Sequence, residues 1–180
     1  MEERLKKALR DYIPLVLIAG LIILVDQFTK SIIRNNLALQ ETWMPWIWLA
    51  PYARIVHWYN TGVAFGMFQN GNLIFSILAA IVSIAIFVVY PRIPREEHIV
   101  RLATAMMLAG ALGNLIDRVT IGHVTDFISI GSFAVFNVAD MSITCGVGVL
   151  ILGVWLQERR DRKQAEKDHP VSPADGEEKP

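Results

Sequence analysis

Four long apolar stretches dominate the pattern of hydrophobic and polar positions along the chain. They cover residues 12–25, 73–90, 99–116 and 135–156. A helix needs roughly 20 mostly apolar residues to cross a hydrocarbon core of about 30 Å. The first stretch is short, but Asp26 and Lys30 lie one turn apart and can pair, so the helix can continue to Ile33. The pattern therefore predicts an all-α membrane protein with four transmembrane helices, at about residues 12–33, 73–90, 99–116 and 135–156.

A cleavable signal peptide is the alternative interpretation of the first stretch, because basic residues precede it. No small-residue cleavage site follows Val25, so we expect this span to be retained. After Leu156 the sequence becomes rich in charge and proline, and we expect residues 157–180 to form a disordered cytoplasmic tail. Residues 1–156 then make up the single membrane domain.

The segments between the spans differ in length and in character. Residues 27–72 hold four of the five tryptophans, which prefer the level of the lipid headgroups. Residues 53–59 and 127–136 are rich in β-forming side chains, and we expect them to form a small sheet at the bilayer surface. The alternative is that these tryptophans only anchor the segment at the membrane surface and bind no ligand.

Composition and charge narrow the class of protein. Hydrophobic residues make up 53% of the 180 residues, and 17 basic residues balance 17 acidic ones. A nucleic-acid binder would need a basic surplus, so nucleic acid is excluded as a partner. The lone Cys145 excludes an internal disulfide and a cysteine zinc site.

The basic residues are distributed unequally between the two sides of the membrane. Four lie in the loops that follow the first and third spans, namely Lys30, Arg34, Arg54 and Arg118. Twelve flank the other ends of the spans, namely Arg4, Lys6, Lys7, Arg10, Arg92, Arg95, Arg101, Arg159, Arg160, Arg162, Lys163 and Lys167. Since cytoplasmic flanks carry the excess of Lys and Arg, we expect both termini in the cytoplasm.

Polar residues inside the third and fourth spans are the candidates for function. In the third span, Ala105, Ala109 and Gly113 repeat every four residues and allow a neighbouring helix to approach closely. Gly110, Asn114 and Arg118 form a second face of the same helix. Such polar groups cost several kcal/mol when they face lipid without a partner. A structural ion pair of Arg118 with Asp117 is the alternative to a functional role.

Two aspartates stand at the outer end of the fourth span. Asp140 lies about one turn inside it, Asn137 precedes Asp140 by three residues, and Asp126 lies across a loop that returns to the same surface. Two close carboxylates share a proton, because one pKa rises, and can act as general base and general acid on one water. The sequence thus suggests aspartic-protease chemistry.

Other hydrolytic chemistries lack their residues in this sequence. The four histidines are scattered and no HExxH motif is present, so a metalloprotease has no ligands and we expect no metal or cofactor. No GxSxG motif is present either.

Five sequence blocks resemble the lipoprotein signal peptidase family, also called signal peptidase II. They are VDQFTK at 25–30, YNTGVAFG at 59–66, GALGNLIDRV at 110–119, HVTDF at 123–127 and FNVADMSI at 136–143. The resemblance implies an inner-membrane aspartic endopeptidase that cleaves diacylglyceryl-modified prolipoproteins just before the lipidated cysteine. It also implies an outward-facing β-cradle with a short extracytoplasmic helix, a monomer in contact with membrane lipid, and inhibition by globomycin.

The resemblance assigns roles to individual residues. Asp126 and Asp140 are the expected catalytic dyad. We expect Asp26 and Lys30 to form a structural ion pair. Phe65 and Phe68 belong to a segment expected to move as a lid over the substrate. The expected substrate-binding residues are Asn60, Gly62, Phe65, Asn114, Arg118 and Asn137.

Two other function classes stay open at this point. In a small transporter or an ion-relay bundle, Asp126, Asp140 and Arg118 would form a proton or ion path. Such a path should cross the whole membrane, whereas the inner halves of the spans hold no ionisable group except Arg101. A structural assembly protein would need no carboxylate pair.

The charge asymmetry gives a testable topology. In a Cys145→Ala background, Ala165→Cys should be protected from a membrane-impermeant thiol reagent added outside, because the basic flanks stay in the cytoplasm. Trp48→Cys in the same background should be labelled. Labelling of Ala165→Cys from the periplasm would overturn the orientation.

Overall fold

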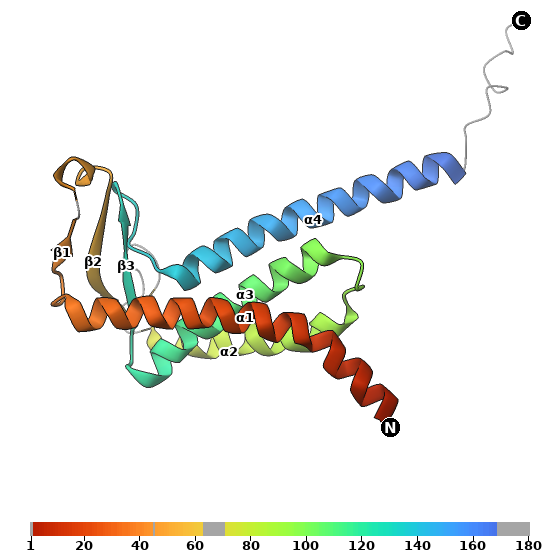
Figure 1. Cartoon of the computed structure of the whole chain (residues 1–180), viewed down its shortest axis with the longest axis horizontal. Coiled ribbons are helices and arrows are strands. Elements are labelled where there is room, and N and C mark those ends of the chain that lie inside the picture. The colour runs from red at the N-terminus through yellow and green to blue at the C-terminus, as the bar shows by residue number, and fades with distance from the viewer. Residues whose placement is uncertain (1, 45, 63–70, 169–180) are drawn as a thin grey trace, which may run out of the picture.

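The computed structural model describes residues 2–44, 46–62 and 71–168 (Figure 1). Its elements follow one another along the chain as α1 Glu2–Asn36, β1 Thr42–Trp43, η1 Ile47–Leu49, β2 Ala53–Asn60, α2 Asn72–Val89, η3 Tyr90–Arg92, α3 His98–Thr120, β3 Val124–Ile130 and α4 Val138–Asp168. The helices form an elongated bundle, and the three strands stand together at one end of it (Figure 1).

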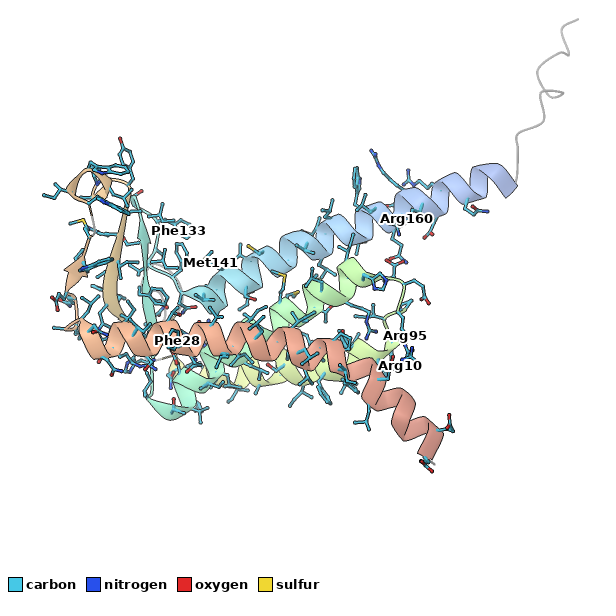
Figure 2. All side chains as sticks on the ribbon, in the orientation of Figure 1. Arg10, Phe28, Arg95, Phe133, Met141 and Arg160 are labelled. Atoms are coloured by element: carbon cyan, nitrogen blue, oxygen red, sulfur yellow. The ribbon has the colours of Figure 1, made fainter. Side chains whose placement is uncertain are left out.

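The four long helices confirm the predicted fold class. Each contains a stretch long and apolar enough to cross a membrane, at Leu9–Asn36, Asn72–Arg92, His98–Thr120 and Val138–Arg162. Large apolar side chains such as Leu17, Phe87 and Ile151 are exposed on the bundle, and side chains project outward along α1 and α4 (Figure 2). Lipid covers such a surface in a membrane protein.

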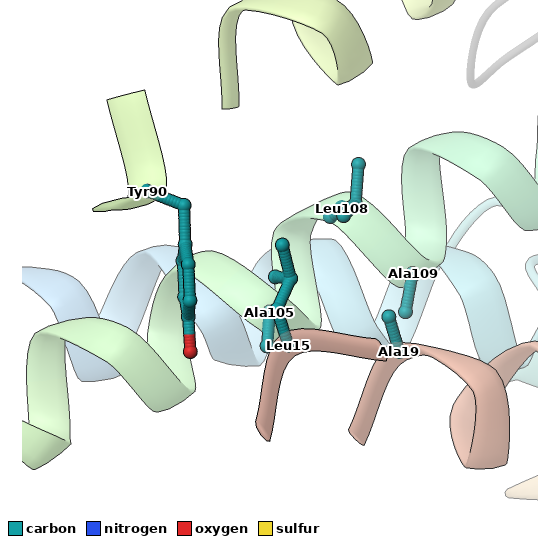
Figure 3. Close-up of a cluster of buried hydrophobic side chains, with 6 residues drawn as sticks. All are labelled: Leu15, Ala19, Tyr90, Ala105, Leu108 and Ala109. Carbon is teal, nitrogen blue, oxygen red and sulfur yellow. The ribbon is translucent and has the colours of Figure 1, made fainter. Parts of the chain in front are cut away.

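Helix α3 lies at the centre of the bundle. In its most apolar stretch 56% of the residues are buried, against 11% in α2 and 22% in α4. Ala105 and Ala109 on α3 pack with Leu15 and Ala19 on α1 and with Tyr90 of η3, in the buried cluster of Figure 3. Small side chains let α1 approach α3 closely, as the four-residue repeat predicts.

Two glycines on α3 set the distance to its neighbours. A Cβ at Gly110 would collide with the Ala139 carbonyl oxygen and the Ile143 side chain, both on α4. A Cβ at Gly113 would lie 2.8 Å from the Asp26 carboxylate on α1. The start of α4 and the C-terminal half of α1 therefore both rest against the C-terminal half of α3.

The three strands form one antiparallel sheet in the order β1-β2-β3. The pairing of β2 with β3 places Trp58 opposite Asp126, with an irregularity between Ile55 and Trp58. The first predicted strand is found almost where the sequence placed it. The second was predicted at 127–136 but occupies Val124–Ile130, because Gly131 takes a left-handed backbone with φ of 53° and ends it.

The tail and the helix ends correct the sequence prediction. Helix α4 continues through residues 157–168, which were expected to be disordered, and its start is Val138 rather than residue 135. Residues 157–168 lack proline and glycine and consist mostly of good helix formers, and Arg162 pairs with Glu158 one turn away at 2.6 Å. Residues 169–180 of the predicted tail lie outside the described residues.

Substitution of Gly110 tests the close approach of α3 and α4. Gly110→Ala should lower the thermal unfolding temperature in detergent, because the backbone of α4 must shift and overpacking of this kind costs about 1–3 kcal/mol. The matched control is Gly148→Ala on α4, where nothing lies within 4 Å of the added Cβ. Equal unfolding temperatures of the two variants, followed by tryptophan fluorescence, would contradict the packing of α3 against α4.

Candidate active site

Asn137 links the two candidate catalytic aspartates. Its side-chain Nδ2 donates to Oδ1 of Asp126 at 2.6 Å, and its backbone N–H donates to Oδ2 of Asp140 at 3.2 Å. Asp126 comes from β3 and is 1% exposed, whereas Asp140 lies in the first turn of α4. The loop between them folds back, as the sequence suggested, so that one asparagine contacts both carboxylates.

The beginning of α4 explains why Asn137 and Asp140 lie so close. Asn137 immediately precedes the helix, and its Oδ1 accepts the backbone N–H of Asp140 at 2.9 Å. With the return bond from the Asn137 N–H to the Asp140 carboxylate, this is a reciprocal capping interaction. The cap fixes the orientation of the Asp140 side chain.

Two further asparagines hold the remaining carboxylate oxygens. Asn60 Nδ2 donates to Oδ2 of Asp126 at 2.8 Å, and Asn114 Nδ2 donates to Oδ1 of Asp140 at 2.8 Å. Asn60 lies two residues after Trp58, which pairs with Asp126, so its side chain is on the same face of the sheet. Three of the expected substrate-binding residues thus also orient the aspartates.

A buried lysine lies behind this layer of asparagines. Lys30 is 0% exposed, and its Nζ contacts Asp26 Oδ2 at 2.9 Å, Asp117 Oδ2 at 3.2 Å and Asn114 Oδ1 at 3.0 Å. The structure contains the ion pair of Asp26 with Lys30 that the sequence predicted and adds a second carboxylate to it. A buried charge needs such partners, because desolvation costs several kcal/mol per ion.

Asp117 corrects one sequence interpretation. It was considered as the partner of Arg118, but it pairs with Lys30, lies 3.6 Å from Arg34 Nη1 and accepts the Thr125 backbone N–H at 3.0 Å. Adjacent residues on a helix point in different directions and do not face each other. Asp117 therefore connects α3 to α1 and β3.

Two contacts around Asp26 were not found by sequence reasoning. Asp26 Oδ1 accepts the backbone N–H of Ala139 at 2.9 Å, so it binds the first turn of α4. Gln27 Nε2 donates to Asp26, to Asp117 and to the Gly113 carbonyl oxygen at 3.1 to 3.2 Å. Spacing within α1 predicts the Asp26–Lys30 pair but not the contacts with Ala139, Gly113 and Asp117, because these residues belong to α3 and α4.

Of the other expected site residues, Gly62 and Arg118 make no hydrogen bond to either aspartate within the part of the chain that the structure describes. The Gly62 N–H donates to Asn60 Oδ1 at 3.0 Å and so orients the amide that binds Asp126. The Arg118 guanidinium lies 5.8 Å from the Phe75 ring centre, and its buried Nε has no hydrogen-bond partner. Over the part of the chain that the structure describes, no ion pair within 4.0 Å joins Arg118 to either aspartate. Phe65 and Phe68, the expected lid residues, lie outside the described residues.

Burial makes the carboxyl group of Asp126 an unusually weak acid. Removal from water raises the pKa of its carboxyl from 3.8 to about 7, and the nearby charge of Asp140 adds to this effect, while the bonds from Asn60 and Asn137 oppose it. The neighbouring His123 packs on Tyr59 with 3.8 Å between ring centres, and burial lowers its pKa. Burial thus favours the protonated form of Asp126 and the neutral form of His123.

The polar groups of the site are carboxylates and amides. Among the residues that the structure describes, no group of three or more His, Cys, Asp or Glu could hold a metal ion. The arrangement can accept a proton on one carboxylate while the other still carries one, which general acid–base catalysis on a water requires.

Comparison with known proteins identifies the family. A family model described as signal peptidase (SPase) II matches residues 18–156. The chain is 39% identical over 137 residues to the lipoprotein signal peptidase of Moorella thermoacetica, covering 76% of this chain and 89% of that protein. It is 40% identical over 148 residues to that of Brevibacillus brevis, covering 81% and 97%.

Solved structures agree with this relationship. One bacterial membrane enzyme, solved by the in meso method at 2.3 Å resolution, matches with a TM-score of 0.73 and 28% identity over 88% of this chain and 93% of its own. A second, at 1.9 Å, gives a TM-score of 0.70 and 31% identity over 78% and 92%. With the family match over all four membrane helices, these likenesses show that the chain belongs to the signal peptidase II family and is a multi-pass bacterial membrane peptidase of the aspartic type.

Proposed function

We propose that Asp126 and Asp140 are the catalytic dyad of an enzyme that cleaves diacylglyceryl-modified prolipoproteins just before the lipidated cysteine. The observation that carries this proposal is the pair of carboxylates held by Asn137, one of which has a pKa of about 7. Family membership supports the removal of signal peptides from prolipoproteins. The dyad is the group in the described structure best suited to that hydrolysis.

The dyad divides the two proton transfers of peptide hydrolysis between its members. Asp126 carries the shared proton, because its carboxyl is buried beside the charge of Asp140. Asp140, whose carboxylate oxygens accept hydrogen bonds from Asn114 and from the Asn137 N–H, takes a proton from the attacking water as the water oxygen bonds to the scissile carbonyl carbon. Asp126 then protonates the leaving amine as the C–N bond breaks.

The position of the dyad suits a substrate anchored by lipid. Asp140 lies at the beginning of a membrane-spanning helix, at the end of the bundle that carries the sheet (Figure 1). Arg10, Arg95 and Arg160 lie toward the opposite end (Figure 2). With the basic end in the cytoplasm, both termini are cytoplasmic and the dyad lies near the outer face of the inner membrane. A lipidated cysteine held there by its acyl chains presents its peptide bond at that level.

The packing of the bundle argues against a proton or ion relay. The core between α1 and α3 is built from Leu15, Ala19, Ala105, Leu108 and Ala109, and Tyr90 is the one buried member of this cluster with a polar side-chain atom. The Lys30 network lies toward the sheet and the buried Arg101 toward the other end. Lys30 donates to Asn114 on the side of the dyad, whereas Arg101 donates to the carbonyl oxygens of Ile93 and Asp11 at the other end. A relay would need one continuous polar chain across the membrane.

Substitution of the dyad tests the proposed chemistry. Asp126→Asn and Asp140→Asn should each lower cleavage of a diacylglyceryl-modified prolipoprotein by about 10²- to 10⁴-fold or more, because each removes one proton transfer. The double variant should be scarcely slower than either single one, since the two act as a unit. Cleavage is measured by gel mobility, with the exposed Asp161→Asn on α4 as the control. Near-normal turnover of Asp140→Asn would refute the dyad.

The pKa of Asp126 predicts how cleavage depends on pH. The value of kcat/KM should fall as pH rises through about 7, because Asp126 then loses the proton that it donates to the leaving amine. Initial rates between pH 5 and pH 9 in one detergent provide the measurement. A rate that stays constant or rises from pH 7 to pH 9 would contradict this assignment of the proton.

The thermal unfolding temperature tests the raised pKa of Asp126 without an activity measurement. Folding raises the pKa of Asp126 from 3.8 to about 7, so the folded state binds more protons and its stability falls as pH rises through this interval. Asp126→Asn removes this loss. Asparagine has only one oxygen for the two donors of Asn60 and Asn137, so the readout is the change with pH and not the absolute stability. From pH 4 to pH 8 the unfolding temperature of the variant should rise relative to that of the unsubstituted chain.

A further inference from the structure

A basic pocket lies at the end of the bundle away from the dyad. Its volume is about 490 Å³, and its polar lining comes from Arg10 and Asp11 on α1 and from Arg95, His98 and Arg101 around the start of α3. Pro14, Ile18 and Leu102 form apolar wall on the two helices. None of these residues takes part in the proposed catalysis.

A proline in α1 contributes to the shape of this pocket. Pro14 lies inside the helix and has no N–H, so α1 cannot make the bond to the carbonyl oxygen of Arg10. The first turns of α1 bend away from the bundle (Figure 1). The pocket opens between this bent part, which carries Arg10, and the segment that carries Arg95; both are labelled in Figure 2.

The charges in the pocket favour an anion. Three guanidinium groups face the single carboxylate of Asp11, and Arg95 Nε already binds Asp11 Oδ1 at 2.6 Å. Arg101 is buried and fixed, because it stacks on Tyr90 and donates to the carbonyl oxygens of Ile93 and Asp11. Arg10 is exposed and the Arg95 side chain is 42% exposed, so these two can reach a ligand at the mouth.

The pocket also lies at the boundary between lipid and water. The apolar stretch of the first span begins at Leu9, that of the second ends at Arg92 and that of the third begins at His98. The arginines therefore lie at the level of lipid headgroups. Ile18 and Leu102 lie deeper in the first and third spans, and Leu102 is 41% exposed, where acyl chains pack.

We propose that this pocket binds one anionic phospholipid, such as phosphatidylglycerol. Its phosphodiester contacts Arg10 and Arg95, and one acyl chain lies along Ile18 and Leu102. Free phosphate would leave the apolar wall uncovered. A zwitterionic lipid brings an ammonium group, for which the pocket offers only the carboxylate that Arg95 already occupies. Basic pockets between membrane helices recognise anionic headgroups in this way. The inference stands apart from the dyad and from the proposed substrate.

Lipid titration with native mass spectrometry tests the site. The full chain in detergent is titrated with phosphatidylglycerol and with phosphatidylcholine of the same acyl chains, and we expect tighter binding of phosphatidylglycerol. Arg10→Gln and Arg95→Gln should each reduce this preference about fivefold, since each basic group near the surface contributes one charge contact. Arg160→Gln, an equal loss of charge on the exposed part of α4, should leave it unchanged.

Three results would overturn the proposal. Equal binding of the two lipids would show that the pocket does not select an anionic headgroup. An equal effect of Arg160→Gln would show that the preference depends on the net charge of the protein and not on this pocket. Complete competition by glycerol 3-phosphate at equal concentration would assign the pocket to a free phosphate. Arg10→Gln leaves the Arg95–Asp11 pair in place, so an instability of Arg95→Gln does not prevent the test. Cleavage activity is not the readout, so failure here is distinguishable from failure of the dyad.

Discussion

The buried ammonium group of Lys30 is the interaction on which the site depends. It joins α1 to α3 through Asp117 and Asn114, and Asp26, its partner on the same helix, binds the first turn of α4. In a bilayer the hydrophobic effect does little to hold helices together, so polar contacts and close packing must do so. The same contacts that join the three helices also place the asparagines around the two aspartates.

The asparagine layer separates this structural charge from the proposed chemistry. Asn114 accepts a hydrogen bond from Lys30 with its oxygen and donates one to Asp140 with its nitrogen. The ion-pair partners of Lys30 are Asp26 and Asp117, and an amide lies between its ammonium group and Asp140. A direct pair would hold the carboxylate in its ionised form, whereas burial beside Asp140 raises the pKa of Asp126 to about 7.

The sequence predicted the parts of this molecule that single segments determine. The four spans were predictable because lipid requires long apolar runs. Asp140 was a candidate because a carboxylate is rare inside a span, whereas the choice of Asp126 as its partner depended on the resemblance to the family. The partner of Asp117, the contact of Asp26 with Ala139 and the contacts of Gln27 with α3 depend on how separate helices approach each other. Residues 157–168 were expected to be disordered because composition alone does not distinguish a charged coil from a charged helix.

The cap at Asn137 fixes where α4 begins, and with it the direction in which the Asp140 side chain points from the helix. One extra residue at the start of this helix would rotate Asp140 by about 100° about the helix axis, away from Asn114. The cap fixes that start, whereas the other end of α4 continues past its apolar stretch to Asp168. Differences in membrane thickness can therefore be taken up at the far end of α4, with no change in the distance between the two carboxylates.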